Sequence, residues 1–292
     1  MSYTHIALAV FVTVLWGFTF VVMRDLLDVL PPFLMSTLRV VAAGAPVLVL
    51  WRVPKIPFYW VLLLGATQGV VQMSLLLFGM QFGMPAGLAS LVLQMQVLFT
   101  TLLAFMLLGE KPGRAQYAGI AISLVGMIVI ASTMPGGGTL IGFGIVILAA
   151  LTWATSNIVV KFAGTDDVIS LVAWAHVIGI LPLLALSYGL EGQNEIFHIL
   201  AELSWFRVGE IAFLGGILTF GGFTLWSYLM RKNSASTVAP FSLIIPIAGM
   251  TSTALILGEE LSTLRMAGAG LVLVGLAFGT IRLGAAKSRA AR

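Results

Sequence analysis

Two basic residues, Arg39 and His176, lie inside long apolar stretches of this chain, and both could take part in chemistry. A cation in such a stretch costs at least ~2.5 kcal/mol unless its side chain faces protein or water. Arg39 could attract an anionic group, or it could be an anchor whose side chain reaches the nearest water. His176 could sense protons, because histidine titrates near neutral pH, or it could be a neutral core histidine held by hydrogen bonds. The sequence leaves both pairs of interpretations open.

Side-chain amides form a second set of polar groups within apolar stretches. Gln72 follows Gln68 by four residues, so the two amides share one face of a helix. Such amides could line a cavity and bind a polar solute, or they could hydrogen-bond between helices at a close-packed glycine face. We expect Gln72, together with Gln94 from a later stretch, to line a cavity.

Aromatic residues recur at helical spacing beside these polar groups. Phe20 follows Trp16 by four residues, which places both on one helix face. Asn157 follows Trp153 at the same spacing. Both pairs could form the walls of a pocket, or they could be ordinary core packing. Pro240 cannot donate a backbone hydrogen bond, which frees a carbonyl within an apolar stretch and suits a cavity wall. We expect all five residues to line the cavity.

Carboxylates and thiols are missing from the apolar stretches. All eleven Asp and Glu residues fall in the gaps or at helix ends, and the chain contains no cysteine. Cysteine nucleophiles, thiolate metal sites and disulfides are therefore excluded, and no paired-aspartate site or His-Glu-x-x-His motif occurs. We expect no enzyme, no metal and no cofactor. A buried carboxylate of the kind that carries protons in pumps and many antiporters is also missing.

The composition shows which elements position these side chains. Apolar residues make up 60% of the chain and charged residues 9%, with a mean hydropathy of +1.08. A helix that spans a bilayer needs about 20 apolar residues. Ten stretches are long enough, at 5–23, 32–51, 58–81, 85–108, 115–133, 139–161, 167–189, 208–230, 236–257 and 263–282. We expect an all-α polytopic membrane protein of ten transmembrane helices.

The basic residues sort between alternate gaps. If the N-terminus is cytoplasmic, the inner gaps and the tail hold eleven Lys and Arg residues, whereas the outer gaps hold three, Arg24, Arg207 and Arg265. Because cytoplasmic loops are rich in Lys and Arg, both termini are expected in the cytoplasm. The net charge of +4 then reflects these loops and not nucleic-acid binding. Apolar residues at helical spacing within 191–207 predict a short amphipathic helix on the outer surface.

The two halves of the chain repeat one another. A shift of 149 residues places the Leu-Gly-Glu triplet at 108–110 on that at 257–259, and Gly119 and Gly126 on Gly268 and Gly275. The repeats 1–134 and 135–283 each hold five expected helices. Because five is an odd number, the second repeat must enter the membrane upside down relative to the first. A basic cytoplasmic tail follows at 284–292. Many secondary transporters build alternating access from inverted repeats. These glycines favour close packing of the fifth expected helix on the tenth. The lesser alternative is that they form a contact between two copies of the chain. We therefore expect a monomer or weak dimer.

Several segments carry a resemblance to a known family. They are LWGFTFVVMR, PPFLMSTLR, FGMPAGLASLVLQMQ, LLGEK, and VAPFSLIIPIAGM with LGEEL after it. Through them the whole chain resembles the EamA-type transporters of the drug/metabolite transporter superfamily. It is similar in kind to bacterial exporters of O-acetylserine and cysteine or of aromatic amino acids. The resemblance implies ten helices in inverted five-helix repeats, with a central cavity lined by helices 1–4 and 6–9 and with helices 5 and 10 outside.

The resemblance also implies a function, namely export of amino acids or related neutral metabolites across the bacterial inner membrane. The partners are then a small molecule and the lipid bilayer, and the missing membrane carboxylate favours a facilitator over a proton-coupled carrier of cationic drugs. Aromatic or hydrophobic amino acids and cysteine-pathway compounds are the expected substrates. Another metabolite class, such as a nucleoside, a sugar phosphate or a drug, is the alternative. An intramembrane enzyme is disfavoured by the missing catalytic groups, and a channel by the inverted repeat.

Overall fold

The structure, a computed structural model, describes residues 2–47, 54–108, 113–133, 138–165, 167–233 and 238–290. Every regular element within these ranges is a helix, which confirms the expected all-α class. The elements labelled η are π-helical (η1, η3) or 3₁₀ (η2, η4). In chain order the elements are α1 (Tyr3–Leu27), α2 (Pro32–Gly44), α4 (Phe58–Leu64), η1 (Gly65–Gln72), α5 (Met73–Gln81), α6 (Ala86–Val92), η2 (Leu93–Met95), α7 (Gln96–Leu108), α8 (Arg114–Ser132), α9 (Gly138–Ala163), α10 (Val168–Leu190), α11 (Gln193–Glu202), α12 (Trp205–Ala212), η3 (Phe213–Gly221), α13 (Gly222–Lys232), η4 (Ala239–Leu243), α15 (Ile244–Leu257) and α16 (Thr263–Ala290).

The described part of the chain is that of a multi-pass membrane protein. Six helical segments are long and apolar enough to cross a bilayer: Tyr3–Leu27, Phe58–Gln81, Ala86–Leu107, Thr139–Ala163, Ile169–Leu190 and Trp205–Trp226. Shorter apolar helices lie at Pro32–Gly44, Tyr117–Ser132, Phe241–Leu257 and Thr263–Phe278. Each segment falls on an expected stretch, although the stretch 32–51 ends outside the described residues. The count of ten spans stays a prediction, because six segments of the described residues meet the length and apolarity of a full crossing.

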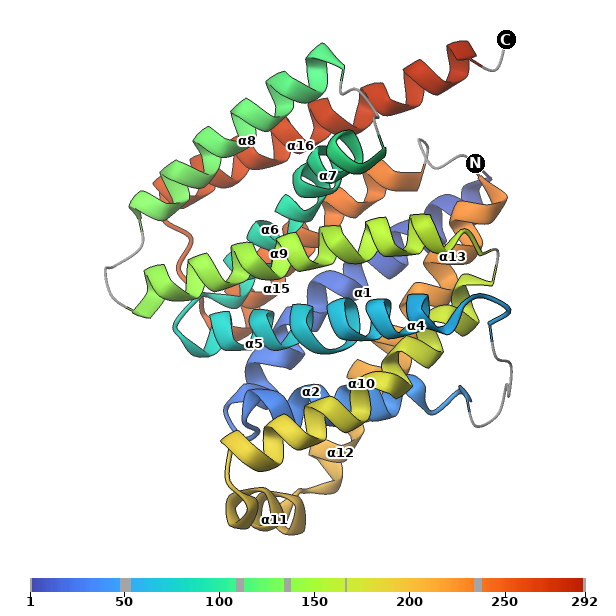
Figure 1. The fold of residues 1–292 in the computed structure, drawn as a ribbon. Coiled ribbons are helices and arrows are strands. Elements are labelled where there is room, and N and C mark those ends of the chain that lie inside the picture. The colour runs from blue at the N-terminus through green and yellow to red at the C-terminus, as the bar shows by residue number, and fades with distance from the viewer. Residues whose placement is uncertain are drawn as a thin grey trace.

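Helices that are far apart in the sequence pack side by side. The pairs are α8 with α16, α1 with α15, α2 with α10 and α5 with α9. Figure 1 shows α8 and α16 along the upper edge of the bundle, with α2 and α10 well below them. Both ends of the chain lie at the upper right, and α11 lies at the opposite, lower end. The helix expected within 191–207 is confirmed as α11.

Glycine allows α8 and α16 to approach closely. A Cβ atom added at Gly275 would lie 2.5 Å from the carbonyl oxygen of Gly119 and 2.7 Å from the backbone nitrogen of Ser123. A Cβ added at Gly126 would lie 2.7 Å from the carbonyl oxygen of Gly268. Larger residues at these positions would push the two backbones apart. The expected glycine packing of 115–133 on 263–282 is therefore confirmed.

Two long helices contain a π-helical segment in mid-course. η1 separates α4 from α5, and η3 separates α12 from α13. Such segments are rare and are frequent at functional sites. Glycine brings each one against a neighbouring helix. A Cβ added at Gly65 would lie 2.9 Å from the carbonyl oxygen of Ala175 in α10, and one added at Gly215 would lie 2.5 Å from that of Arg39 in α2.

The N-terminus of α2 is capped by a carboxylate from the second half of the chain. α2 follows Pro31, which provides no side-chain cap. Glu191, which follows α10, accepts hydrogen bonds from the backbone amides of Phe33 (2.5 Å) and Leu34 (2.9 Å) and from the Ser187 hydroxyl (2.8 Å). The first amides of a helix have no partner within it, and this end carries partial positive charge. The carboxylate therefore supplies the acceptor that proline cannot.

The N-terminus of α6 is capped in the same way. α6 follows Pro85 and has no side-chain cap of its own. The Glu259 carboxylate accepts hydrogen bonds from the amides of Ala86 (2.6 Å) and Gly87 (2.9 Å). Gly258, with φ of +67°, ends α15 in the left-handed conformation that glycine adopts at little cost. Both carboxylates belong to the second half and both helices to the first, so these two carboxylate caps join the halves.

A third polar contact lies at the same end of the bundle. Arg207, in the first turn of α12, donates hydrogen bonds to the carboxylates of Asp25 in α1 and, at 2.7 Å, of Glu210. α1 ends and α2 begins here, so this contact and the carboxylate caps share the end opposite the two termini. This end is held by directed hydrogen bonds between charged and polar groups.

We expect Gly275→Val to lower the thermal unfolding temperature of the purified protein in detergent by several degrees. The added side chain would meet backbone atoms of α8, and overpacking of this kind costs roughly 1–3 kcal/mol. Gly270→Val on the same helix is the control, because a Cβ there would meet nothing within 4 Å. Equal unfolding temperatures for the two variants would contradict the packing of α8 against α16.

Candidate functional site

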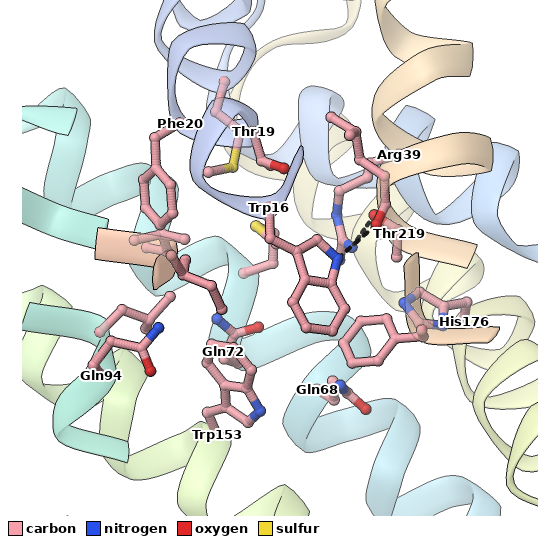
Figure 2. Close-up of a pocket in the computed structure, with 17 residues that line it drawn as sticks. Trp16, Thr19, Phe20, Arg39, Gln68, Gln72, Gln94, Trp153, His176 and Thr219 are labelled. Atoms are coloured by element: carbon pink, nitrogen blue, oxygen red, sulfur yellow. Dashed lines mark hydrogen bonds between the residues drawn. The ribbon is translucent and has the colours of Figure 1, made fainter. Parts of the chain in front are cut away.

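A cavity lies in the middle of the bundle, with residues from both halves in its wall (Figure 2). Its volume is about 90 Å³. One water needs roughly 10–15 Å³ of such space, so the cavity has room for several waters or one small solute. The wall residues are Trp16, Thr19, Phe20, Met23, Arg39, Gln68, Gln72, Met73, Leu76, Leu93, Gln94, Trp153, His176, Leu218, Thr219, Phe223 and Ile245. None of them belongs to α8 or α16.

Arg39 is the permanent cation of the described wall. Its side chain projects from the middle of α2, and only 3% of the residue is exposed. Nη1 donates a long hydrogen bond, of 3.4 Å, to the hydroxyl of Thr219 in η3. Nε and Nη2 are buried without a hydrogen-bond partner. The side chain thus faces the cavity and not the surface, which removes the interpretation of Arg39 as an anchor that reaches outside water.

His176, from the middle of α10, is held in one orientation. Its Nδ1 lies 2.8 Å from the carbonyl oxygen of Val172, one turn earlier in the helix. A carbonyl only accepts hydrogen bonds, so Nδ1 carries a proton and Nε2 is left for any second partner. The residue is 2% exposed. It is a buried, hydrogen-bonded histidine, as one alternative from the sequence allowed, and it also lines the cavity.

The polar groups divide between two sides of the cavity. In Figure 2, Arg39, Thr219 and His176 lie on one side, and Gln94 and Trp153 lie on the other. The amides of the wall come from η1 and from η2, so irregular helical segments supply them. Gln72 and Gln94 are 5% and 2% exposed. The described wall therefore has a cationic side and a neutral side that can donate and accept hydrogen bonds.

Trp16 joins α1 to the second half at the cavity. Its indole Nε1 donates a 2.9 Å hydrogen bond to the carbonyl oxygen of Leu218 in η3. The ring centroid lies 5.2 Å from that of Phe223 and 5.5 Å from that of Trp226. A Cβ at Gly222 would collide with the indole, so the glycine makes room for it. Trp16 is thus a fixed aromatic surface in the wall.

Most residues that the sequence singled out line this cavity. They are Trp16, Phe20, Arg39, Gln72, Gln94, Trp153 and His176. Binding of a substrate by them stays a prediction. Asn157 is not in the wall, because its amide donates to Gln96 Oε1 (2.8 Å) and Thr100 Oγ1 (3.0 Å) and joins α9 to α7. The side chain of Pro240 lies outside the described residues.

Sequence reasoning missed the contribution of the second π-helical segment. Thr219 and Phe223 line the cavity from η3 and α13, and neither was expected there. The available signal was their spacing of four residues within an apolar stretch, which places a hydroxyl and a ring on neighbouring turns. Gln68 was considered with Gln72 and also lines the cavity. These residues can bind a small polar solute with an apolar part.

Comparison with known proteins gives one matching family and two similar proteins of the same name. The model of the EamA-like transporter family matches residues 4–132 and 140–281. A Salmonella typhimurium protein named "Probable amino-acid metabolite efflux pump" is 36% identical over 275 residues, covering 92% of each chain. An Escherichia coli K12 protein of the same name is 34% identical over 282 residues, covering 94% of each chain.

A solved crystal structure of another protein shares the fold. It superposes with a TM-score of 0.62 at 17% sequence identity, over 96% of this chain and 97% of the other. The family match covers nearly the whole chain, and the two relatives extend over most of it. The protein is a membrane transporter rather than an enzyme. The chain belongs to the EamA-like transporter family.

Proposed function

We propose that this protein exports amino acids or related neutral metabolites across the bacterial inner membrane. The names of the two relatives, amino-acid metabolite efflux pumps, support the substrate class. The central cavity is the observation that carries the proposal, because it joins aromatic surface, amides and one cation in the middle of the bundle. Small-molecule sites typically combine apolar walls with a few placed polar groups. Aromatic or hydrophobic amino acids and cysteine-pathway compounds fit this description.

The proposal includes ten transmembrane spans in two inverted repeats, 1–134 and 135–283. Two observations support the repeat: the family model matches once in each half, and a π-helical segment interrupts the third expected span of each half. The excess of Lys and Arg in alternate gaps supports cytoplasmic termini, and Figure 1 shows both termini at one end. The end with the carboxylate caps then faces the outside. The working unit is proposed to be a monomer or a weak dimer.

Alternating access assigns a role to the carboxylate caps. Glu191 and Glu259 hold α2 and α6 of the first half at the outer end. Hydrogen bonds to charged groups contribute about 1.5–3 kcal/mol each. We expect outward opening of the cavity to separate the halves at this end and to break these bonds. The form described here is therefore proposed to be the outward-closed one.

The transporter is proposed to be a facilitator. The described wall contains no carboxylate, and its one histidine, His176, is buried with Nδ1 fixed on the Val172 carbonyl oxygen. Stoichiometric proton coupling needs a group in the pathway that titrates on each side in turn. The gradient of the substrate itself then sets the direction of transport, and a cell that accumulates an amino acid would lose it outward.

We expect Gln72→Ala and Trp153→Ala to lower transport several-fold in liposomes. Each change removes a hydrogen-bonding amide or an aromatic surface of the wall, which costs roughly 1 kcal/mol. The measurement is counterflow of radiolabelled L-phenylalanine, L-leucine and O-acetyl-L-serine. Gln81→Ala and Trp205→Ala are the matched controls, because both residues are exposed and lie outside the wall. Parent rates in both cavity variants would assign these side chains to packing alone.

We expect a membrane-impermeant maleimide added outside intact cells to label Gln193→Cys and neither Ser2→Cys nor Ser288→Cys. The chain has no natural cysteine, so each variant carries a unique thiol. The reason is the orientation: α11 faces outside and both termini face the cytoplasm. All three variants should react once the cells are opened, which serves as the control. Labelling of residue 288 from outside would reject the orientation and with it the inverted repeat.

A further inference from the structure

The guanidinium of Arg39, a residue of the cavity wall, has one edge whose nitrogens are buried without a hydrogen-bond partner. Nη1 is the nitrogen that donates to Thr219, whereas Nε and Nη2 have no hydrogen-bond partner. Nη1 lies on the side of Cδ, so the N–H groups of Nε and Nη2 point the same way as a parallel pair. This pair of donors matches the two oxygens of a carboxylate, which it binds side-on through two hydrogen bonds.

A free edge is unusual at such burial. Arg39 is 3% exposed, and it takes part in none of the ion pairs formed by the described residues. Buried charges are normally paired, because an unpaired one loses its hydration without compensation. Among the described residues the bundle retains this cost at Arg39, which is a residue of the cavity wall. An anionic ligand would remove it.

The charge of the cavity wall limits which charged groups a ligand can carry besides a carboxylate. Among the 17 residues drawn around the cavity none is a carboxylate. The polar groups opposite Arg39 are neutral amides, and the Nδ1 proton of His176 is donated to Val172. A ligand with one carboxylate and no ammonium therefore balances the charge of Arg39. A ligand with an ammonium alone adds a second positive charge, which the low dielectric of the interior penalises.

We propose that Arg39 binds the carboxylate of the ligand through Nε and Nη2, and that this carboxylate is required whereas an amino group is dispensable. The proposal rests on the proposed function, since it takes the bound molecule to be the transported one. It names the substrate class as monocarboxylates with a small apolar body, of which amino acids are one kind.

Two compounds with the same apolar body and opposite charge test the proposal directly. We expect 3-phenylpropionate to raise the thermal unfolding temperature of the purified protein, because a ligand that binds only the folded state stabilises it. Phenethylamine should leave it unchanged. Arg39→Gln should weaken 3-phenylpropionate binding by about tenfold or more, since it removes two charge-assisted hydrogen bonds. Arg39→Lys should restore binding only in part, because an ammonium cannot form the two-bond pair.

The controls separate a lost site from a damaged protein. Arg24→Gln should bind 3-phenylpropionate normally, because Arg24 is 42% exposed and pairs with Asp28 at the end of α1. Arg39→Gln without ligand should unfold at or above the parent temperature, since it removes an unpaired buried charge. Three results would each overturn the proposal. The first is an equal shift of the unfolding temperature with both compounds, and the second is no shift with 3-phenylpropionate or with the smaller propionate. The third is a full shift with 3-phenylpropionate in Arg39→Gln.

Counterflow of L-phenylalanine distinguishes this proposal from the proposed function. Transport by Arg39→Gln with an unchanged KM would overturn the carboxylate site and leave the export function intact. A second result would overturn the export function and leave the carboxylate site intact. In it the parent protein moves none of L-phenylalanine, L-leucine and O-acetyl-L-serine, but 3-phenylpropionate still raises its unfolding temperature.

Discussion

The arrangement of the two halves depends on backbone amides that cannot find a partner within their own helices. Lipid offers no hydrogen bonds, and α2 and α6 each begin after a proline that provides no cap. The acceptors come from elsewhere in the chain, because Glu191 and Glu259 of the second half provide them. These caps fix the two helices of the first half at one end. Further along, α2 packs on η3 and α10, and η1 packs on α10 and α9.

The middle of the bundle is held differently from its capped end. There glycine packs against backbone, as at Gly65 and Gly215, and Arg39 donates one long hydrogen bond to Thr219. The π-helical segments turn amides and a hydroxyl toward the centre, where Arg39 keeps two nitrogens unpaired. Helix N-termini capped at one end and unpaired hydrogen-bond donors at the centre are consistent with a transporter. In the proposed cycle a ligand would pair with the unpaired donors of Arg39, and opening would break the hydrogen bonds of the carboxylate caps.

Much of this could be predicted from the sequence, because the bilayer imposes simple rules. Helix positions follow from apolar length, and the contact of α8 with α16 follows from glycines spaced along both. The wall positions of Trp16, Gln72 and Arg39 follow because polar and aromatic groups in apolar helices face the interior. The π-helical segments leave no mark in local propensity, so Thr219 was missed. Asn157 was misplaced because its partner, Gln96, lies on another helix. The sequence places Glu259 in a gap or at a helix end and does not show which amides its carboxylate would cap.

The most direct test of this account measures the width of the capped end. Spin labels at Phe82 and Glu260, which are both exposed and belong to different halves, would report the distance between the halves in the purified protein. The account predicts one dominant short distance in the parent, and a second, longer population when Glu191 and Glu259 are both changed to Ala. Glu202→Ala is the control, because Glu202 is exposed and pairs only with His198 among the described residues. An unchanged distance distribution after loss of both caps would contradict the central claim that they hold the pathway closed.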